Sequence, residues 1–419
     1  MSTPLRELLP SMRQVHLDSV ERELDRMWRE HNASVAGPGS HGITRNSILT
    51  LVVYTQTLEQ ATRALRIAHA LSTQHSSRTI ILTADPRVDA NNVESYVGAT
   101  VSVDGTSFGE DILIVSHGEA TRHLPGVVLP FIVSGLPAFL WWVGEPPWGS
   151  ELFEALVDGC DRLILDTSGL ADIPAGLTAI ADLMRRKKSR CAVSDTGWTC
   201  QTPWREIVAQ FFDPAEARQY LDGIEQISIE YAAGEEDAPA NPAEAYLFAG
   251  WLVSRLGWRI QHLPSDRSVA SSHLTAYAGA NRAVSVEINP RYGVPQQAWW
   301  DNGTPVAAGV HDAQDGHQEA PVLAVRRGAL MSVHISARIG GGPRATFTMA
   351  RERDLGHATT LCQLPDGSMP PSQTVHLQSI GEEAPLAQQL QRLGHDTIFE
   401  EAVTAASQLA GSHARRRWS

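Results

Sequence analysis

Apolar residues change spacing repeatedly along the first half of the chain, and this change predicts a β-α-β fold. Residues 47–54 form a continuous β-branched and apolar run, which is typical of a strand buried on both faces. Residues 58–74 then repeat apolar positions every three or four residues, as an amphipathic helix does. A second short apolar run follows at 79–83, so we expect two parallel strands joined by a right-handed helical crossover.

The same alternation continues to about residue 194. Further strands are predicted at 100–103, 111–116, 137–143 and 162–166, and helical segments at 118–133, 153–159 and 173–186. A mostly parallel sheet with helices on its faces explains this order. We therefore predict an α/β domain over residues 45–194, preceded by a helical arm and linker over residues 1–44, in which residues 5–31 carry the helical pattern.

Beyond residue 195 the pattern changes to a few helices and a series of longer strands. Helices are predicted at 204–212 (with Thr202 as N-cap and Pro203 in the first turn), 243–256 and 386–409, the last interrupted near Gly394. Strands are predicted at 283–288, 322–325, 330–339, 345–350, 357–361 and 374–377. Polar residues alternate along these strands, which favours antiparallel pairing. We predict an α+β C-terminal domain with a largely antiparallel sheet over residues 195–419.

Composition and charge narrow the class of protein. The chain has 419 residues, 42% of them apolar, and a formal net charge of -13, which argues against a nucleic-acid-binding protein. The uncharged stretch 127–143 is nearly long enough to span a bilayer, but prolines and a glycine interrupt it, so we expect a turn within the α/β core. The first ten residues include charged residues and prolines, unlike a signal peptide. We expect a cytoplasmic protein that binds neither nucleic acid nor membrane.

The four cysteines, Cys160, Cys191, Cys200 and Cys362, have neither C-x-x-C nor zinc-site spacing. This pattern favours free thiols in a reducing compartment. Cys191 and Cys200 are close in sequence and are the candidates for a redox pair, although the sequence does not give the separation of their side chains.

The chain lacks the common catalytic motifs, including a Walker loop, a G-x-S-x-G elbow and an H-E-x-x-H helix. Its histidines have no metal-ligand spacing, so we expect no metal, no cofactor and no catalytic activity. The candidates for anion binding are His75 and Arg78 at a strand entrance, and Arg122 and His123 at the start of a helix. Ordinary polar turns and surface ion pairs would explain the same four residues.

Two proline-punctuated aromatic stretches, residues 139–148 and 195–214, contain five of the eleven tryptophans. Large aromatic anchors and arginine are common at binding surfaces, and an arginine can stack on an indole. The candidates for partner binding are therefore Trp141, Trp142, Trp148, Trp198, Trp204 and Arg205. A buried junction between the two predicted domains would use the same residues, and the two interpretations are compatible.

The order of several short motifs resembles the OpcA family. The motifs are Arg45-Asn46-Ser47 before the first strand, His75-Ser-Ser-Arg78, Arg122-His-Leu-Pro125, Leu136 to Trp142, Asp166-Thr-Ser168, Asp195 to Trp198, and Pro203 to Glu206 followed by Phe211 to Pro214. The resemblance covers residues 20–215 closely and the remainder more loosely. It implies a non-enzymatic protein that binds glucose-6-phosphate dehydrogenase, favours its active oligomer and so supports NADPH production in the oxidative pentose phosphate pathway.

The cysteine pattern departs from the family. In photosynthetic members activation is associated with paired cysteines toward the C-terminal half, where this chain has only Cys362. A thiol switch is therefore expected only if Cys191 and Cys200 take that role. The alternative function is a sugar-phosphate-binding or hydrolysing enzyme, or a metabolite sensor, with a site at the carboxyl ends of the α/β strands, near the anion-binding candidates and His117.

Overall fold

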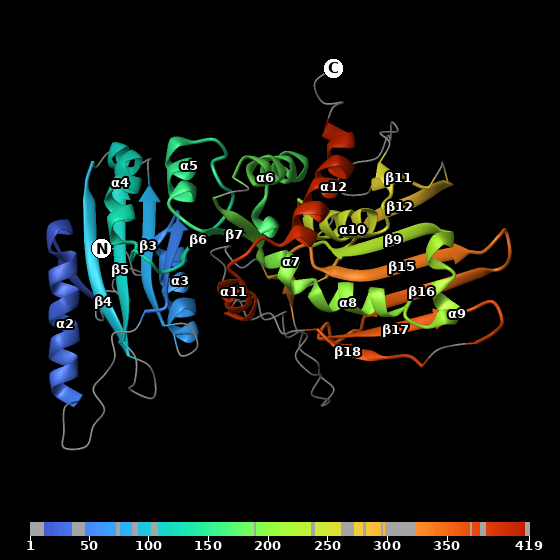
Figure 1. The fold of residues 1–419 in the computed structure, drawn as a ribbon, viewed down its shortest axis with the longest axis horizontal. Coiled ribbons are helices and arrows are strands. Elements are labelled where there is room, and N and C mark those ends of the chain that lie inside the picture. The colour runs from blue at the N-terminus through green and yellow to red at the C-terminus, as the bar shows by residue number, and fades with distance from the viewer. Residues whose placement is uncertain are drawn as a thin grey trace, which may run out of the picture. The chain divides into compact units, whose positions relative to one another are not determined.

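The computed structural model of the chain describes residues 12–35, 47–72, 76–85, 91–101, 108–187, 190–235, 239–260, 272–279, 282–294, 296–297, 324–368, 371–377 and 383–414. The chain divides into two compact units, drawn in Figure 1. Unit 1 comprises Met1–Asp166, Lys187–Ser194 and Glu382–His395, and unit 2 comprises Thr167–Arg186, Asp195–Gly381 and Asp396–Ser419. Each unit is therefore assembled from segments that are distant in sequence.

The sheet of unit 1 has eight strands in the order β1-β4-β5-β3-β2-β6-β7-β8. The strands are β1 (Met12–Val15), β2 (Leu49–Thr55), β3 (Ser77–Asp85), β4 (Val93–Val101), β5 (Phe108–His117), β6 (Ala138–Trp142), β7 (Arg162–Leu165) and β8 (Ala192–Asp195). Strands β5, β3, β2, β6 and β7 pair in parallel, whereas β1 and β4 are antiparallel to their neighbours. The predicted α/β fold with a mostly parallel sheet is confirmed.

The longer helices of unit 1 are α2 (Val20–Val35), α3 (Leu58–Leu71), α5 (Glu151–Asp158) and α11 (Glu383–Leu390). Residues 118–131 form the short pieces η3 (Gly118–His123), α4 (Leu124–Val128) and η4 (Leu129–Phe131). The apolar stretch 127–143 therefore ends in a turn and strand β6. None of the helices within the described ranges is long and apolar enough to cross a membrane.

Two expectations for unit 1 were wrong in their boundaries. The helix predicted over residues 5–31 begins only at Val20, and Met12–Val15 instead pairs with β4 as an edge strand. A single turn, η2 (Leu17–Ser19), separates the strand from the helix. The strand predicted at 100–103 begins earlier, at Val93, because it pairs along its whole length with β5.

The sheet of unit 2 also has eight strands, in the order β10-β11-β12-β9-β15-β16-β17-β18. The strands are β9 (Ile224–Ala232), β10 (Arg259–Ile260), β11 (Ser272–Ala278), β12 (Arg282–Arg291), β15 (Leu330–Arg338), β16 (Arg344–Arg351), β17 (His357–Gln363) and β18 (Thr374–His376). All neighbours pair antiparallel except β9 and β12, which are parallel. A separate parallel pair joins β13 (Gln296–Gln297) to β14 (Val325–Arg326). The predicted largely antiparallel sheet is confirmed.

The longer helices of unit 2 are α6 (Ile173–Lys187), α8 (Thr202–Gln210), α10 (Ala243–Arg255) and α12 (Thr397–Ala414). The shorter pieces are η5 (Thr167–Gly169), α7 (Thr196–Cys200), α9 (Ala215–Arg218) and η6 (Leu221–Gly223). Thr202 is the first residue of α8 and not its N-cap, since Gln201 occupies the N-cap position.

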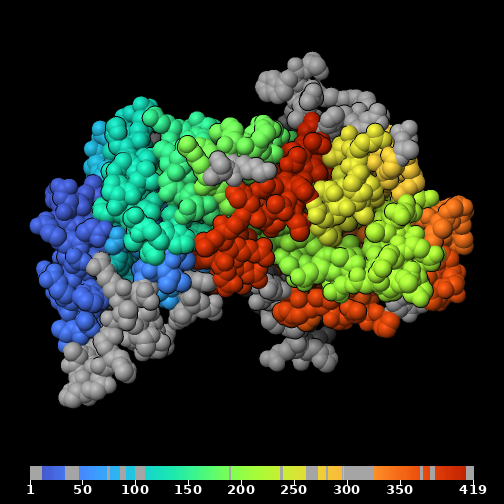
Figure 2. Space-filling model, viewed as in Figure 1, coloured from blue at the N-terminus to red at the C-terminus, as the bar shows by residue number. Residues whose placement is uncertain are grey.

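Helices α10 and α12 lie side by side, and Figure 2 shows the red surface of α12 directly against the yellow surface of α10. Gly250 of α10 allows this close approach. A Cβ atom at Gly250 would lie 2.3 Å from the carbonyl oxygen of Ala402. The lack of a side chain at this position therefore sets the distance between the two helices.

Candidate functional site

The first candidate region is the point in unit 1 where the strand order reverses. Strand β2 pairs with β3 on one side and with β6 on the other. In open α/β sheets, ligands bind in the crevice at the carboxyl ends of the strands beside such a reversal.

Aromatic rings pack together at the carboxyl ends of β2 and β6. Tyr54 and Trp142 are paired in register, and their rings stack with centroids 3.8 Å apart. Phe153 meets Trp142 edge-on at 5.0 Å, and Trp148 meets Phe153 at 5.6 Å. Tyr54, Trp142 and Phe153 are buried, and this burial raises the pKa of Tyr54. The reversal point is packed as core.

The connection from β2 to α3 also differs from a phosphate-binding loop. It consists of Gln56 and Thr57, whereas a dinucleotide-binding turn needs glycines to let the backbone approach the pyrophosphate. Thr57 Oγ1 accepts a hydrogen bond from the backbone N–H of Gln60 at 3.2 Å. The side-chain Oε1 of Gln60 in turn accepts from the backbone N–H of Gln56 at 2.8 Å. The chain's own side chains therefore cap this helix start, and the residues do not fit a bound dinucleotide.

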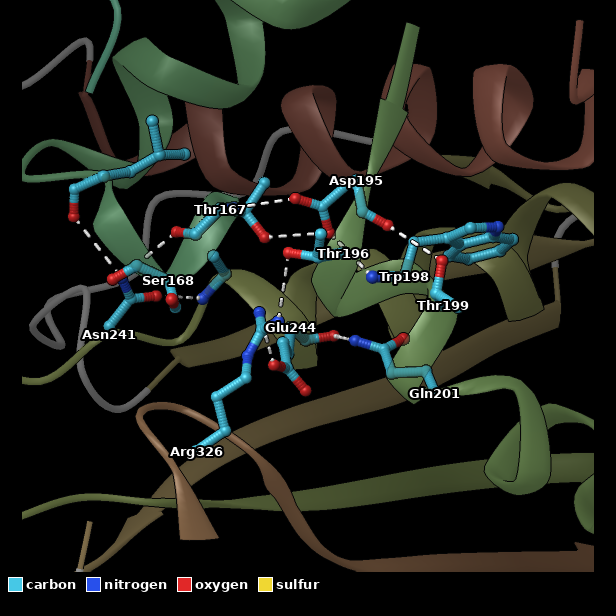
Figure 3. A network of polar contacts seen from close by, with 12 residues as sticks. Thr167, Ser168, Asp195, Thr196, Trp198, Thr199, Gln201, Asn241, Glu244 and Arg326 are labelled. Carbon is cyan, nitrogen blue, oxygen red and sulfur yellow. Dashed lines mark hydrogen bonds and ion pairs between the residues drawn. The ribbon is translucent and has the colours of Figure 1, made fainter. Parts of the chain in front are cut away.

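The second candidate region is a polar cluster in unit 2, which we call the Asp195 corner: Thr167, Asp195, Trp198, Arg205, Asn241, Glu244, Arg326 and Asp396. Figure 3 shows most of it. Asp195 is fully buried, and each of its two carboxylate oxygens accepts a hydrogen bond from a different segment of the chain. One oxygen accepts from the backbone N–H of Trp198 at 2.7 Å, which caps α7, and the other accepts from the backbone N–H of Thr167 at 2.7 Å.

Trp198 and Arg205 form a stacked pair within this corner. The Arg205 guanidinium lies 3.5 Å from the centroid of the Trp198 ring. It also donates to the Trp198 carbonyl oxygen at 2.7 Å and to Thr202 Oγ1 at 3.0 Å. On the other side, the Trp198 indole donates to Asp396 Oδ2 at 3.1 Å, while Asp396 Oδ1 caps α12 by accepting from the backbone N–H of Phe399 at 3.0 Å. The pair therefore links α7 to the start of α12.

A buried ion pair occupies the centre of the corner. Glu244 and Arg326 lie 2.8 Å apart, with side-chain exposures of only 4% and 5%. The Glu244 carbonyl oxygen accepts from Gln201 Nε2 at 2.9 Å. Any side chain at position 197 would clash, since a Cβ at Gly197 would lie 2.3 Å from Arg326 Nη2. A side chain at position 197 would therefore force the Arg326 guanidinium to shift.

Asn241 joins the corner to the loop before α6. Its amide Nδ2 donates to the carbonyl oxygens of Thr167, Ser168 and Leu170 at 2.9–3.3 Å. Its Oδ1 accepts from the backbone N–H of Ala243 at 3.0 Å, at the start of α10. The carboxylates, amides and arginines of the Asp195 corner bind within the corner itself. The corner therefore holds helices and loops of unit 2 together through polar contacts.

One arrangement in unit 2 superficially resembles a hydrolytic triad. His273 lies between Ser285 Oγ and Glu287 Oε1, at 3.4 Å from each. All three side chains lie on paired strands, β11 and β12, whose backbone N–H groups serve strand pairing. These groups therefore cannot form an oxyanion hole above Ser285, and the distances are long for a nucleophile and its base.

The structure buries most of the predicted partner-binding residues. The exposures of Trp141, Trp142, Trp198 and Trp204 are between 0% and 3%. Trp148 and Arg205 are partly exposed. The two partly exposed side chains are thus the ones able to touch a partner without rearrangement, and the partner-binding role of all six residues stays a prediction.

The described anion-binding candidates lie on two different elements, Arg78 on β3 and the adjacent Arg122 and His123 on η3. Arg78 is buried and donates to Glu110 at 2.7 Å, to Glu21 at 2.6 Å and to the Phe131 carbonyl oxygen at 3.0 Å, which fixes α2 to the sheet. Arg122 forms an exposed ion pair with Glu119 at 3.0 Å. His123 is exposed, and His75 lies outside the described residues.

In the described part of the chain, neither redox candidate is joined in a disulfide bond. Cys191 is buried in unit 1, and burial raises the pKa of its thiol to about 12. Cys200 is partly buried in unit 2. A thiol that stays protonated at neutral pH is a poor nucleophile, which makes Cys191 slow to react in the folded state.

The Glu244–Arg326 pair and the Asn241 contacts were not predicted from sequence. Glu244 begins a predicted helix, where an acidic residue is common, and Arg326 follows a predicted strand. Nothing in the sequence links these two positions, which only the fold of unit 2 brings together.

Comparisons with known proteins give one consistent result. Two family models match the chain: the glucose-6-phosphate dehydrogenase subunit N-terminal domain over residues 68–182, and the corresponding C-terminal domain over residues 191–403. Three cyanobacterial relatives, each provisionally named OxPP cycle protein OpcA, are similar in sequence.

The protein from Synechocystis sp. is 25% identical over 295 residues, which is 70% of this chain but only 54% of the relative. The chain thus matches about half of that relative's length. The protein from Synechococcus elongatus is 24% identical over 363 residues, covering 85% of this chain and 73% of the relative. The protein from Nostoc punctiforme is 25% identical over 358 residues, covering 81% and 66% respectively.

Among solved structures, apo levoglucosan dehydrogenase is similar with a TM-score of 0.44 at 10% identity, covering 89% of this chain and 97% of that one. The transcriptional regulator Gal80p of Kluyveromyces lactis gives 0.43 at 8% identity, covering 87% and 91%. At these values neither similarity implies an activity or a ligand for this chain.

Proposed function

Because the chain belongs to the OpcA family of glucose-6-phosphate dehydrogenase subunits, we propose that it is a non-enzymatic activating subunit of glucose-6-phosphate dehydrogenase. It binds the dehydrogenase in the cytoplasm, favours the active oligomer and so supports NADPH production in the oxidative pentose phosphate pathway. The observation that carries the proposal is the match of both family domains, which together span most of the chain.

The geometry of unit 1 supports the non-enzymatic part of the proposal. The reversal point of the sheet is packed with Tyr54, Trp142 and Phe153, and the following turn lacks glycine. A hydride-transferring enzyme of this topology needs that space for its nicotinamide cofactor. We therefore assign catalysis to the dehydrogenase and not to this chain.

Activation by a binding protein has a simple energetic requirement. The chain must bind the active state of the dehydrogenase more tightly than the inactive state. A tenfold shift in the balance between the two states needs about 1.4 kcal/mol of differential binding. One or two well-packed aromatic or arginine contacts are sufficient for this.

The test measures dehydrogenase activity with glucose 6-phosphate and NADP⁺, using the enzyme of the same organism with and without this chain. Light scattering after size exclusion of the mixture measures complex formation. We expect higher activity together with a co-eluting complex, and no turnover by the chain alone. No complex and no change in activity would contradict the proposal, and turnover by the chain alone would contradict its non-enzymatic part.

The alternative of a sugar-phosphate enzyme receives no support from the geometry. Its residues Arg78 and His117 lie at opposite ends of paired strands, because Arg78 pairs with Glu110 and Asp85 pairs with His117. Seven strand positions correspond to about 23 Å. A single phosphate cannot contact both residues, which counts against a sugar-phosphate site that uses Arg78 and His117 together.

A further inference from the structure

Two histidines face each other across the edge of the unit 2 sheet. His357 of β17 is in register with His376 of β18. In the adjacent pair, the backbone N–H of Leu377 donates to the Gly356 carbonyl oxygen at 2.8 Å. Because hydrogen-bonded and non-hydrogen-bonded pairs alternate along antiparallel strands, His357 and His376 occupy a non-hydrogen-bonded pair. Side chains approach each other most closely at such pairs, and here the ring centroids are 5.1 Å apart.

Asp354 fixes the orientation of one of the two rings. Its Oδ2 lies 2.6 Å from Nδ1 of His357. Its Oδ1 accepts from the backbone N–H groups of Gly356 at 3.0 Å and His357 at 3.2 Å. Since the carboxylate is the acceptor, His357 Nδ1 carries the proton, and the lone pair of the neutral ring is on Nε2.

Both rings are accessible to solvent. The His357 side chain is 40% exposed, and His376 is also exposed. In the described part of the chain, no group of three or more histidine, cysteine, aspartate or glutamate side chains could hold a metal ion. Among the described residues, an ion bound between these two rings would have two protein ligands, and water would occupy further coordination positions.

We propose that His357 and His376 form a two-histidine site for a divalent transition-metal ion, with Asp354 as the residue that positions the His357 ring. Imidazole nitrogen suits Zn²⁺, Ni²⁺ and Cu²⁺. Histidine ligands in metal sites commonly donate their second ring nitrogen to a carboxylate, as His357 does to Asp354. An ion at this position would join β17 to β18, an edge strand of three residues.

The proposal is tested by titrating NiCl₂ into the metal-free, untagged full-length chain in a calorimeter. We expect one equivalent of Ni²⁺ to bind at neutral pH, and this binding to disappear in His357→Ala and in His376→Ala. Asp354→Asn should weaken binding about tenfold, because it removes the group that orients the ligand.

The matched control is His273→Ala, which removes a half-exposed histidine from the strand β11 of the same sheet. It should leave the Ni²⁺ isotherm unchanged. Circular dichroism in EDTA checks that each variant is folded, and His376→Gln replaces His376→Ala if the latter is not. Absence of stoichiometric binding by the wild-type chain, or equal binding by the wild-type and a folded His376 variant, overturns the proposal.

Discussion

At the scale of single residues, the structure assigns buried polar side chains to structural tasks. Asp195 caps α7, Asn241 ties a loop to α10, and Arg78 fixes α2 to the sheet of unit 1. Removing one partner of a buried, well-paired charge lowers the stability of the protein strongly, because the other charge stays buried without a partner. Substituting such a residue should therefore lower the free energy of unfolding more than substituting a charged residue on the surface does.

The Glu244–Arg326 pair gives the clearest case. Replacing Arg326 with Met leaves Glu244 buried without its counter-ion, and we expect the free energy of unfolding to fall by about 3–5 kcal/mol. The control is Arg122→Ala, which breaks an ion pair whose side chains are 76% and 69% exposed, and should cost less than about 1 kcal/mol. Urea unfolding followed by tryptophan fluorescence measures both. Equal effects in the two variants would contradict the assignment.

Arg205 is the residue at which binding and stability are most easily separated. Its guanidinium stacks on Trp198 at 3.5 Å but remains partly exposed. Arg205→Ala should cost about 1 kcal/mol of stability through loss of the stacking and should weaken activation of the dehydrogenase. The neighbouring exposed residue provides the control, Glu206→Ala. Unchanged activation by a folded Arg205→Ala variant would remove Arg205 from the docking surface.

The Cys191 thiol gives a prediction about pH. Because burial raises its pKa to about 12, the folded state keeps the thiol protonated well above the pH at which an unfolded chain loses the proton. Its contribution to stability is therefore fully present below about pH 8.5 and is lost as the pH rises toward 12. At pH 8, Ellman's reagent should react with Cys191 more slowly than with the partly exposed Cys200. Fast reaction of Cys191 in folded protein would show that this thiol is available for redox chemistry.

At the scale of helices and strands, hydrophobic spacing predicted most of the fold. Continuous apolar runs located β2 and β6, which are buried along their whole length. Strand β9 was missed, although its buried positions alternate through Ile227, Ile229 and Tyr231. The strand also contains two glutamates, a glutamine and a serine, which lower the apparent strand tendency of a strand that is central in the sheet.

The candidate sites were less predictable than the elements, for a physical reason. The aromatic stretch at residues 139–148 was evident in sequence, but its packing against Tyr54 depends on the pairing of β6 with β2. Likewise, the pairing of His357 with His376 depends on strand register, which spacing alone does not give. The local sequence shows which chemical groups are present. Which groups contact one another depends on the tertiary structure.

The packing of α10 on α12 can be tested with two glycines. Gly250→Ala places a Cβ against the backbone of Ala402 and Ala406, so the helices must separate and stability should fall by about 2 kcal/mol or more. Gly411→Ala, on α12 itself, meets nothing within 4 Å and should stabilise the chain by up to about 1 kcal/mol, since alanine favours helix. Thermal unfolding compares the two variants. A neutral Gly250→Ala would mean that the helices are not closely packed there.

At the scale of the whole molecule, each unit is completed by residues near the end of the chain. Residues 382–395 belong to unit 1, where α11 packs on α3 and Arg162 donates to Gln389 and to the Gly394 carbonyl oxygen. Residues 396–419 belong to unit 2, where α12 packs on α10. Removing everything after residue 381 should therefore destabilise both units. In a chain whose two domains are each continuous in sequence, the same truncation would destabilise only the second domain.

The strand reversal in unit 1 bears on the proposal that this chain activates the dehydrogenase and has no catalytic activity of its own. Unit 1 has the strand reversal at which nucleotides bind in related topologies, but Tyr54 and Trp142 stack at its carboxyl edge and Gln56-Thr57 replaces a glycine turn. We expect the chain alone to leave NADPH fluorescence unchanged at concentrations that saturate the dehydrogenase, while the mixture of the two proteins shows higher turnover. The variant Trp142→Ala is the control for folding, since it should unfold more easily without gaining NADPH binding. Binding of NADPH by the wild-type chain would show that the aromatic packing opens, and it would return the reversal point to consideration as a nucleotide site.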